Sequence, residues 1–157
     1  MGLREEFLHE PVSELKIMPG VVLPTTATVR QAIDQMRKAQ QGCVIVVNDK
    51  GIPEGKFTEH QLAGLICDDR PSFMEKKIGH FVRDAWARMS HRDPIATLIH
   101  RLLTYGLRHV IVVDDEGKPL GVVGQRAIME YIADYFPRAV KVQETDAKVA
   151  IENREGA

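Results

Sequence analysis

Hydrophobic and polar positions repeat along this chain with a fixed offset of 66 residues. The apolar word VIVV occurs at 44–47 and again at 110–113, and the offset aligns 12–69 with 78–135 without a gap. Apolar positions fall on apolar positions outside these words as well: Ile33 on Ile99, Met36 on Leu102, Leu62 on Ile128. A repeat of this length indicates one supersecondary unit used twice, with each unit burying its apolar face against the other.

Each copy predicts the elements β-α-β-β-α, which makes the fold class α+β. Short apolar runs at 21–23 and 87–89 predict the first strands. The unbroken VIVV run predicts a strand that is covered on both faces. A polar turn with glycine joins it to another strand, at 54–57 or 120–123, as a hairpin. A helix with apolar residues on one face closes each copy.

The helix between the first two strands has a recognisable start in both copies. Thr28, followed three residues later by Gln31, forms a capping box. In the second copy, Asp93 is expected to be the N-cap and Pro94 the first helical residue.

The repeats divide the chain into five predicted parts. These are an N-terminal docking segment at 1–11, the first repeat at 12–69, a linker at 70–77, the second repeat at 78–136 and a polar tail at 137–157.

Composition and charge argue against several classes of function. The formal net charge of −1 gives no general attraction to nucleic acid or to anionic membranes. The two cysteines form no CxxC motif, and no apolar run reaches membrane-spanning length, so a cytoplasmic protein is expected. No paired carboxylates, catalytic triad or metal-ligand spacing can be placed, which argues against an enzyme and against a metal site.

The tandem βαββα unit, with its hairpin word VIVVDDEGKPLGVV at 110–123, resembles a pair of CBS (cystathionine-β-synthase-type) domains, a Bateman module. The resemblance covers about 12–136. It implies two repeats packed about a pseudo-two-fold axis, and a homodimer of such modules. It also implies a regulatory role without catalysis, in which AMP, ADP, ATP or S-adenosylmethionine binds in clefts between the repeats and a separate effector protein is controlled.

The family's ribose-binding motif is incomplete in both copies. In nucleotide-binding members, the hairpin ends in Ser or Thr, followed three residues later by an Asp that accepts hydrogen bonds from the ribose. The first copy has Thr58 and Gln61 at these positions, and the second has Gly124 and Ala127. Thr58 and Gln61 are therefore either part of a ligand site or a capping box and nothing more.

A small basic group in the second copy points to an anion. Arg108 and His109 precede the second VIVV strand, and Arg126 follows Gly124 at the start of the last helix. Such donors, beside the free N–H groups of a helix start, suit a phosphate. In the competing interpretation, Arg108 and Arg126 form surface ion pairs with Asp114, Asp115 or Glu130. If one cleft is occupied, its basic wall should come from the second copy.

Two functions remain open at this point. The first is a ligand sensor, in which a nucleotide or another anion biases one arrangement of the module. The second is a dimerising scaffold with degenerate clefts, which would associate through apolar helix faces that include Leu65, Ile66, Ile132 and Tyr135. Trp86 fits either stacking on an adenine or a packing role, such as covering a dimer face.

Overall fold

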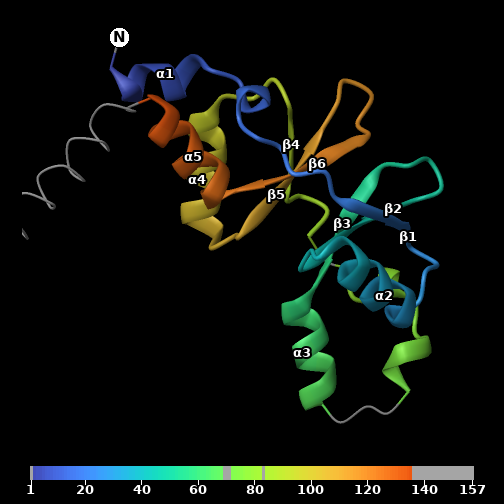
Figure 1. Cartoon of the computed structure of the whole chain (residues 1–157). Helices are drawn as coiled ribbons and strands as arrows, with labels where there is room; N and C mark the ends of the chain where they lie inside the picture. Colours follow the sequence, from blue (N-terminus) through green and yellow to red (C-terminus); the bar gives the residue numbers. More distant parts are fainter. Residues whose placement is uncertain (1, 69–71, 83, 136–157) are drawn as a thin grey trace, which may run out of the picture.

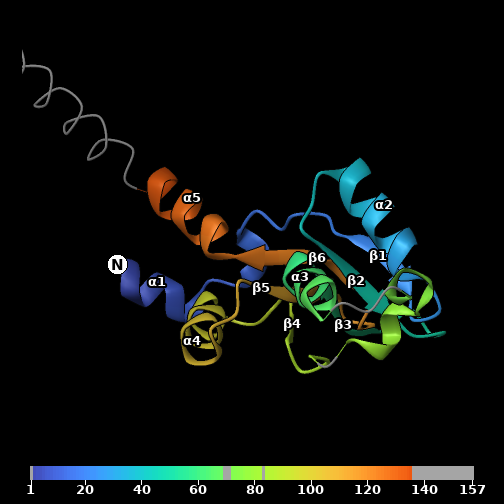
Figure 2. The same cartoon turned by 90° about the horizontal axis from the view of Figure 1, so that it is seen from below.

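The computed structural model describes residues 2–68, 72–82 and 84–135, which form two lobes (Figures 1 and 2). The first lobe contains β1 (Val21–Pro24), α2 (Val29–Ala39), β2 (Cys43–Val47), β3 (Pro53–Thr58) and α3 (Glu59–Cys67). The second contains β4 (Arg88–Ser90), α4 (Ile95–Tyr105), β5 (His109–Val113), β6 (Pro119–Gly124) and α5 (Gln125–Tyr135). The predicted βαββα order is confirmed in both copies. The predicted tail at 137–157 lies outside the described residues.

Three further short elements lead into the lobes. They are α1 (Leu3–His9) with the 3-10 turn η1 (Val12–Glu14), and the 3-10 turns η2 (Phe73–Glu75) and η3 (Ile78–His80). α1 packs against α4, and the ring of Phe7 lies 5.8 Å from that of Tyr131 in α5. None of the helices in the described ranges is long and apolar enough to span a bilayer.

The two sheets are built in the same register. In each, the first strand runs parallel to the second, and the third pairs antiparallel with the second. Val44 lies opposite Phe57 in one hairpin, and Val110 lies opposite Val123 in the other, at the offset of 66. The two copies of the sequence therefore form superposable hairpins.

The central strands are buried on both faces, as the VIVV pattern predicts. Val44 and Val46 belong to the core of the first lobe, under its helices. Ile45 points the other way and joins Ile111 and Val122 in a small cluster at the seam between the two sheets. Alternate residues of one strand therefore hold the lobe together and join it to its neighbour.

The segment in front of each sheet packs into the other lobe. Val12 is fully buried in the core of the second lobe, and Ile78 is fully buried in the core of the first. Backbone hydrogen bonds fix both segments in the same way. The Val12 N–H donates to the Asp93 carbonyl, and the Ile78 N–H donates to the Ala27 carbonyl, both at 2.8 Å. These four residues differ pairwise by 66, so a pseudo-two-fold axis relates the halves.

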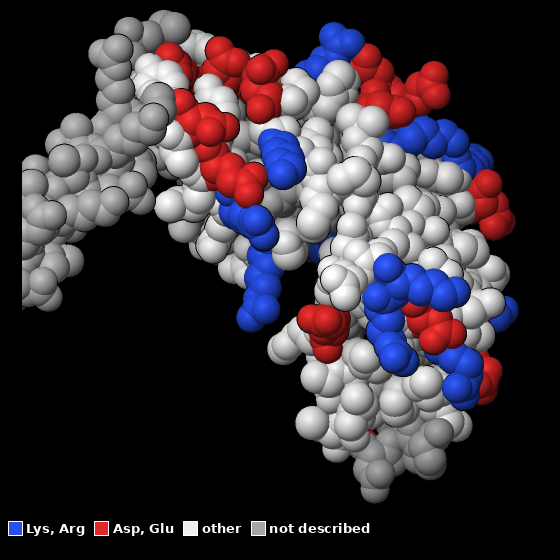
Figure 3. Space-filling model, in the orientation of Figure 1, with Lys and Arg blue, Asp and Glu red and all other residues white. Residues whose placement is uncertain are grey.

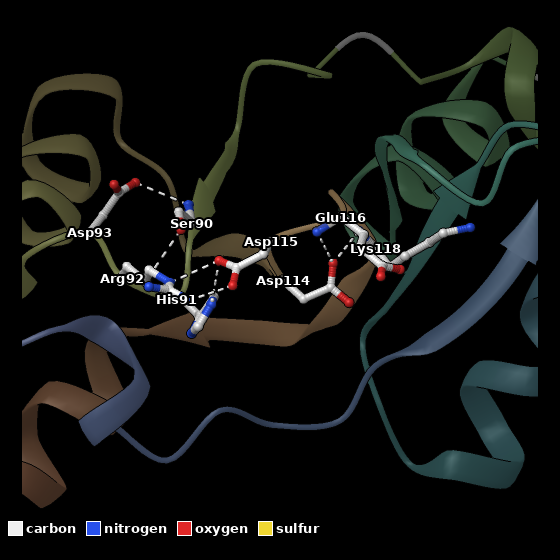
Figure 4. Close-up of polar contacts among 8 residues, drawn as sticks. All are labelled: Ser90, His91, Arg92, Asp93, Asp114, Asp115, Glu116 and Lys118. Carbon is white, nitrogen blue, oxygen red and sulfur yellow. Dashed lines mark hydrogen bonds and ion pairs between the residues drawn. The ribbon is translucent and has the colours of Figure 1, made fainter.

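One predicted helix start is confirmed and the other is wrong. Thr28 Oγ1 accepts the Gln31 N–H at 3.2 Å, and Gln31 Oε1 accepts the Thr28 N–H at 2.9 Å, which completes the capping box. In the second copy the N-cap of α4 is Pro94, not Asp93. The Asp93 carboxylate instead accepts the Ser90 N–H at 3.0 Å (Figure 4), so it closes the turn before the helix.

Candidate functional site

A cleft of about 330 Å³ lies where the segment before β1 crosses the end of β6 and the start of α5. Its walls contain Lys16–Pro19, His109, Val122–Gly124, Arg126, Ala127 and Glu130. The structure thus brings together three of the predicted site residues, His109, Gly124 and Arg126. Most of the wall is apolar, and the charged side chains are Lys16, Arg126 and Glu130, a composition typical of a site for a small polar ligand.

Backbone pairing fixes the shape of this cleft. The Met18 N–H donates to the Val122 carbonyl, and the Val122 N–H donates to the Met18 carbonyl, each at 2.9 Å. Gly121 makes this approach possible, because it has a φ of +152° and a Cβ there would collide with the Met18 carbonyl oxygen. The floor of the cleft therefore does not depend on the side chains that line it.

His109 is a titratable group in this wall. It begins β5, is half-buried, and pairs with Gly124 across the hairpin. Burial lowers its pKa below the ordinary 6.5, and the charges of Lys56 and Arg108 lower it further. At neutral pH the ring is therefore uncharged and offers one hydrogen-bond donor and one acceptor to a ligand.

Gly124 is required by the backbone beside it. A Cβ at this position would collide with the Arg108 carbonyl oxygen and lie 3.0 Å from Cδ2 of the His109 ring. The glycine therefore lets β5 and β6 close together at the point where α5 begins.

Arg126 stands at the rim of the cleft. Its Nε donates to Glu130 Oε1 at 2.9 Å, one helical turn further on, and 90% of its side chain is exposed. The competing interpretation, a surface ion pair with Glu130, is thus confirmed for Arg126. Exposed pairs at this spacing contribute only about 0.3–0.5 kcal/mol to stability, so the ion pair holds the guanidinium weakly.

Arg108 is exposed and does not line the cleft. The carboxylates proposed as its partners are used by other groups (Figure 4). Asp115 pairs with Arg92 and lies 3.1 Å from His91 Nε2. Asp114 accepts backbone N–H groups of its own turn. Arg108 therefore acts on the site through its charge on His109 and not by contact with the cleft.

Thr58 and Gln61 form the capping box of α3. Gln61 Oε1 accepts the Thr58 N–H at 2.8 Å, and Thr58 Oγ1 accepts the Gln61 N–H at 3.4 Å. The other end of the amide, Nε2, donates to the Phe81 carbonyl at 2.8 Å. These hydrogen bonds account for both residues without a ligand.

The place in the first copy that corresponds to this cleft, called the first crevice below, is occupied by an ion pair that sequence reasoning missed. Lys56 is the one charged residue that is buried among those the structure describes, and its Nζ lies 2.9 Å from Asp84 Oδ2. The repeat could have indicated this pair, because at the offset of 66 each of the two charged residues aligns with an apolar one: Lys56 with Val122, and Asp84 with Met18. Sequence reasoning also left out Lys16 and the segment to Pro19, and did not place Glu130 in the cleft.

Three of the other candidate residues lie away from the cleft. Trp86 is 51% exposed and packs edge-on against Tyr105, with ring centroids 4.9 Å apart, which fits the packing alternative. Leu65 was assigned to a dimer face, and this is wrong, because it is 8% exposed and belongs to the core of the first lobe. Ile66, its neighbour, is 59% exposed.

The charged surface differs between the lobes. In Figure 3, acidic side chains gather over the lobe that carries α1 and α5, with basic side chains beside them. Glu14, Glu130 and Asp134 line a shallow groove between η1 and α5. Lys16 lines this groove as well, so acidic and basic side chains lie side by side here.

Comparison with known proteins gives consistent results. The family model described as CBS domain matches the chain at 12–68 and 79–134. A CBS domain protein from Pyrobaculum aerophilum, solved in complex with AMP, has a TM-score of 0.68 and 21% identity, covering 85% of this chain and 96% of that one. A CBS domain pair/ACT domain protein from Thermotoga maritima has a TM-score of 0.63 and 20% identity, covering 80% and 98%.

A third structure is the CBS domain pair of protein MJ0100, in complex with 5′-methylthioadenosine and S-adenosyl-L-methionine. Its TM-score is 0.68 at 17% identity, covering 80% of this chain and 97% of that one. No curated protein sequence matches the chain. The structural matches confirm the predicted α+β fold of two repeats.

Proposed function

Because the chain belongs to the CBS domain family, we propose that it is a ligand-sensing regulatory module whose ligand binds in the cleft between 16–19 and the start of α5. The ligand is an adenosine-type nucleotide or another small anion. One observation carries this proposal: a single cleft joins an apolar wall to the basic side chains of Lys16 and Arg126 and to the ring of His109.

The position of the cleft suits regulation. Residues 16–19 lead into the first lobe, while β6 and α5 belong to the second. A ligand held there contacts parts of both lobes, so it favours whichever arrangement of the lobes makes those contacts. The AMP bound by the Pyrobaculum aerophilum protein supports an adenine nucleotide as the first ligand to test.

Ribose recognition must differ from the family motif. Ala127 offers no side-chain hydrogen bond, and Gly124 offers no hydroxyl. Glu130, one helical turn after Ala127, supplies a carboxylate to the same cleft. It accepts hydrogen bonds from ligand hydroxyls, while Arg126 and Lys16 hold the phosphate.

Thermal unfolding with AMP, ADP, ATP and S-adenosylmethionine tests the proposal, with isothermal titration calorimetry to measure affinity. A ligand at 100 times its Kd stabilises the fold by about 2.7 kcal/mol, which is readily measured as a rise in Tm. No shift with any of these compounds would contradict adenosine-type binding.

A dimerising scaffold is the second candidate, and exposed apolar helix residues favour it. Ile66, Leu103 and Met129 are 59%, 75% and 64% exposed. If the chain is a homodimer by light scattering, and Ile66→Asp makes it monomeric without changing nucleotide response, dimerisation is separate from sensing.

A further inference from the structure

We propose that Lys56 is an anion site that the chain fills with its own Asp84 carboxylate, closing the crevice that corresponds to the ligand cleft. Of the two equivalent places, the one in the second copy is then open and the one in the first is occupied by the chain itself. The count of one ligand per chain rests on the proposed function, whereas the self-occupied anion site does not.

Lys56 stands in a position that the second copy gives to an apolar residue. It pairs with Ile45 in the first hairpin as Val122 pairs with Ile111 in the second. The other three of these four residues form the buried cluster at the seam. An ammonium in the fourth place needs a counter-charge, because an unpaired buried cation is strongly destabilising.

Asp84 supplies that charge and also replaces a backbone group. Its Oδ1 accepts the Lys56 N–H at 3.0 Å, and its Oδ2 lies 2.9 Å from Lys56 Nζ. In the second copy, the Met18 carbonyl accepts the corresponding N–H, that of Val122. One carboxylate therefore completes the strand pairing and neutralises the lysine, with side-chain exposures of 6% for Lys56 and 26% for Asp84.

The backbone is shaped to admit this carboxylate. Gly55 has a φ of +145°, and a Cβ there would collide with Asp84 Oδ1 and with Val82 Cγ1. Phe81 packs against Phe57, with ring centroids 6.1 Å apart, and its carbonyl accepts the Gln61 side chain. Side-chain contacts thus hold Phe81, Val82 and Asp84 at the first crevice, whereas at the second cleft Lys16 takes the place of Val82.

Removing the internal anion should create a site for a free one. Asp84→Ala leaves Lys56 buried without its partner, and we expect Tm to fall by on the order of 10 °C. Acetate, which carries the same carboxylate, should then raise the Tm of Asp84→Ala more than that of the wild type at equal ionic strength. Asp84→Asn, which keeps an oxygen for the Lys56 N–H and still fills the space, should show a smaller loss and little rescue by acetate.

Two controls separate this effect from general stabilisation by salt. Asp115→Ala removes an exposed, ion-paired aspartate, and its Tm should not respond to acetate beyond the wild-type response. Lys56→Val combined with Asp84→Met installs the residues of the second copy; it should be more stable than Asp84→Ala and insensitive to acetate. Equal acetate responses in all variants, or a double variant no more stable than Asp84→Ala, would overturn the proposal.

The ligand count is measured separately, with AMP as the probe. Calorimetry should give one AMP per wild-type chain, and two per chain would show that the first crevice opens to ligands. Absence of AMP binding would overturn the adenosine-type ligand and leave the acetate result to decide the anion site by itself.

Discussion

Ile45 and Ile111 pack in one cluster at the seam between the sheets, although 66 residues separate them in the chain. Each is 1% exposed, and each lies on the face of its central strand that turns away from its own helices. This cluster and the exchanged segments together hold one repeat to the other, so the lobes are expected to unfold together.

Truncation of either isoleucine tests this coupling. Ile45→Ala and Ile111→Ala should each lower the free energy of unfolding by about 2–5 kcal/mol, because each leaves a cavity at the same interface. Urea denaturation followed by circular dichroism should show one transition in both variants. Leu103→Ala, at a site 75% exposed, is the control and should change stability little. Two separate transitions in the wild type would contradict a shared core.

Arg126 should contribute to phosphate binding in particular. Arg126→Ala removes the guanidinium at the rim of the cleft, so AMP affinity should fall roughly tenfold, as expected for loss of a charge-assisted hydrogen bond, while adenosine affinity changes little. Calorimetry measures both. Arg30→Ala is a matched control, because Arg30 forms an exposed ion pair of similar length, 2.8 Å, with Glu75, outside the cleft. Equal losses for AMP and adenosine would argue against a phosphate contact.

Glu130 should select for the sugar and not for the anion. Glu130→Gln takes away the carboxylate that accepts ligand hydroxyls, and it also frees Arg126 from its ion pair. AMP binding is therefore expected to weaken several-fold, while inorganic phosphate binds equally well or more tightly. Competition between the two ligands measures the difference. Weaker binding of both would place Glu130 in a purely structural role.

His109 should make stability depend on pH. Its pKa in the folded protein is below 6.5, so between that value and 6.5 the unfolded chain binds more protons. The contribution of His109 to stability is thus complete above pH 6.5 and is lost as the pH falls through this window. Urea denaturation between pH 5 and 8 measures the slope, which His109→Gln should reduce. An unchanged slope would contradict the assignment.

The same histidine reports on the first crevice. Lys56 lowers the pKa of His109, and the Asp84 carboxylate opposes that charge at close range. Asp84→Asn should therefore lower the pKa of His109 further, and Lys56→Met should raise it. Titration of the His109 ring by NMR measures both shifts. A bound phosphate should raise the same pKa, so anion binding is expected to strengthen at lower pH.

The periodic part of the fold could be predicted from the chain, and the long-range part could not. The offset between Val44 and Val110 identified both hairpins and their two-sided burial, since those depend on local pattern. Asp93 has the residue type and position of an N-cap, yet its carboxylate bonds to Ser90, a choice that local spacing does not decide. Leu65 follows helical spacing, but spacing alone does not say which face meets the core.

The candidate site was predicted in part for the same reason. His109 and Gly124 pair across one hairpin and Arg126 is in the helix that follows it, so their proximity follows from the hairpin. Lys56 and Asp84 are 28 residues apart, and either alone reads as an ordinary surface charge. What marks them as a pair is that each is charged where the other copy has an apolar residue.

The segment in front of each repeat completes the hydrophobic core of the other repeat. Val12 and Leu15 fill the interior that 87–135 builds, while Phe73 and Ile78 fill the interior that 21–67 builds. A cut between the repeats would thus produce two fragments, each with a gap where the other's residues belong. A half with a complete core would need segments that are far apart in the sequence. The shortest unit expected to fold by itself is therefore the whole pair of repeats.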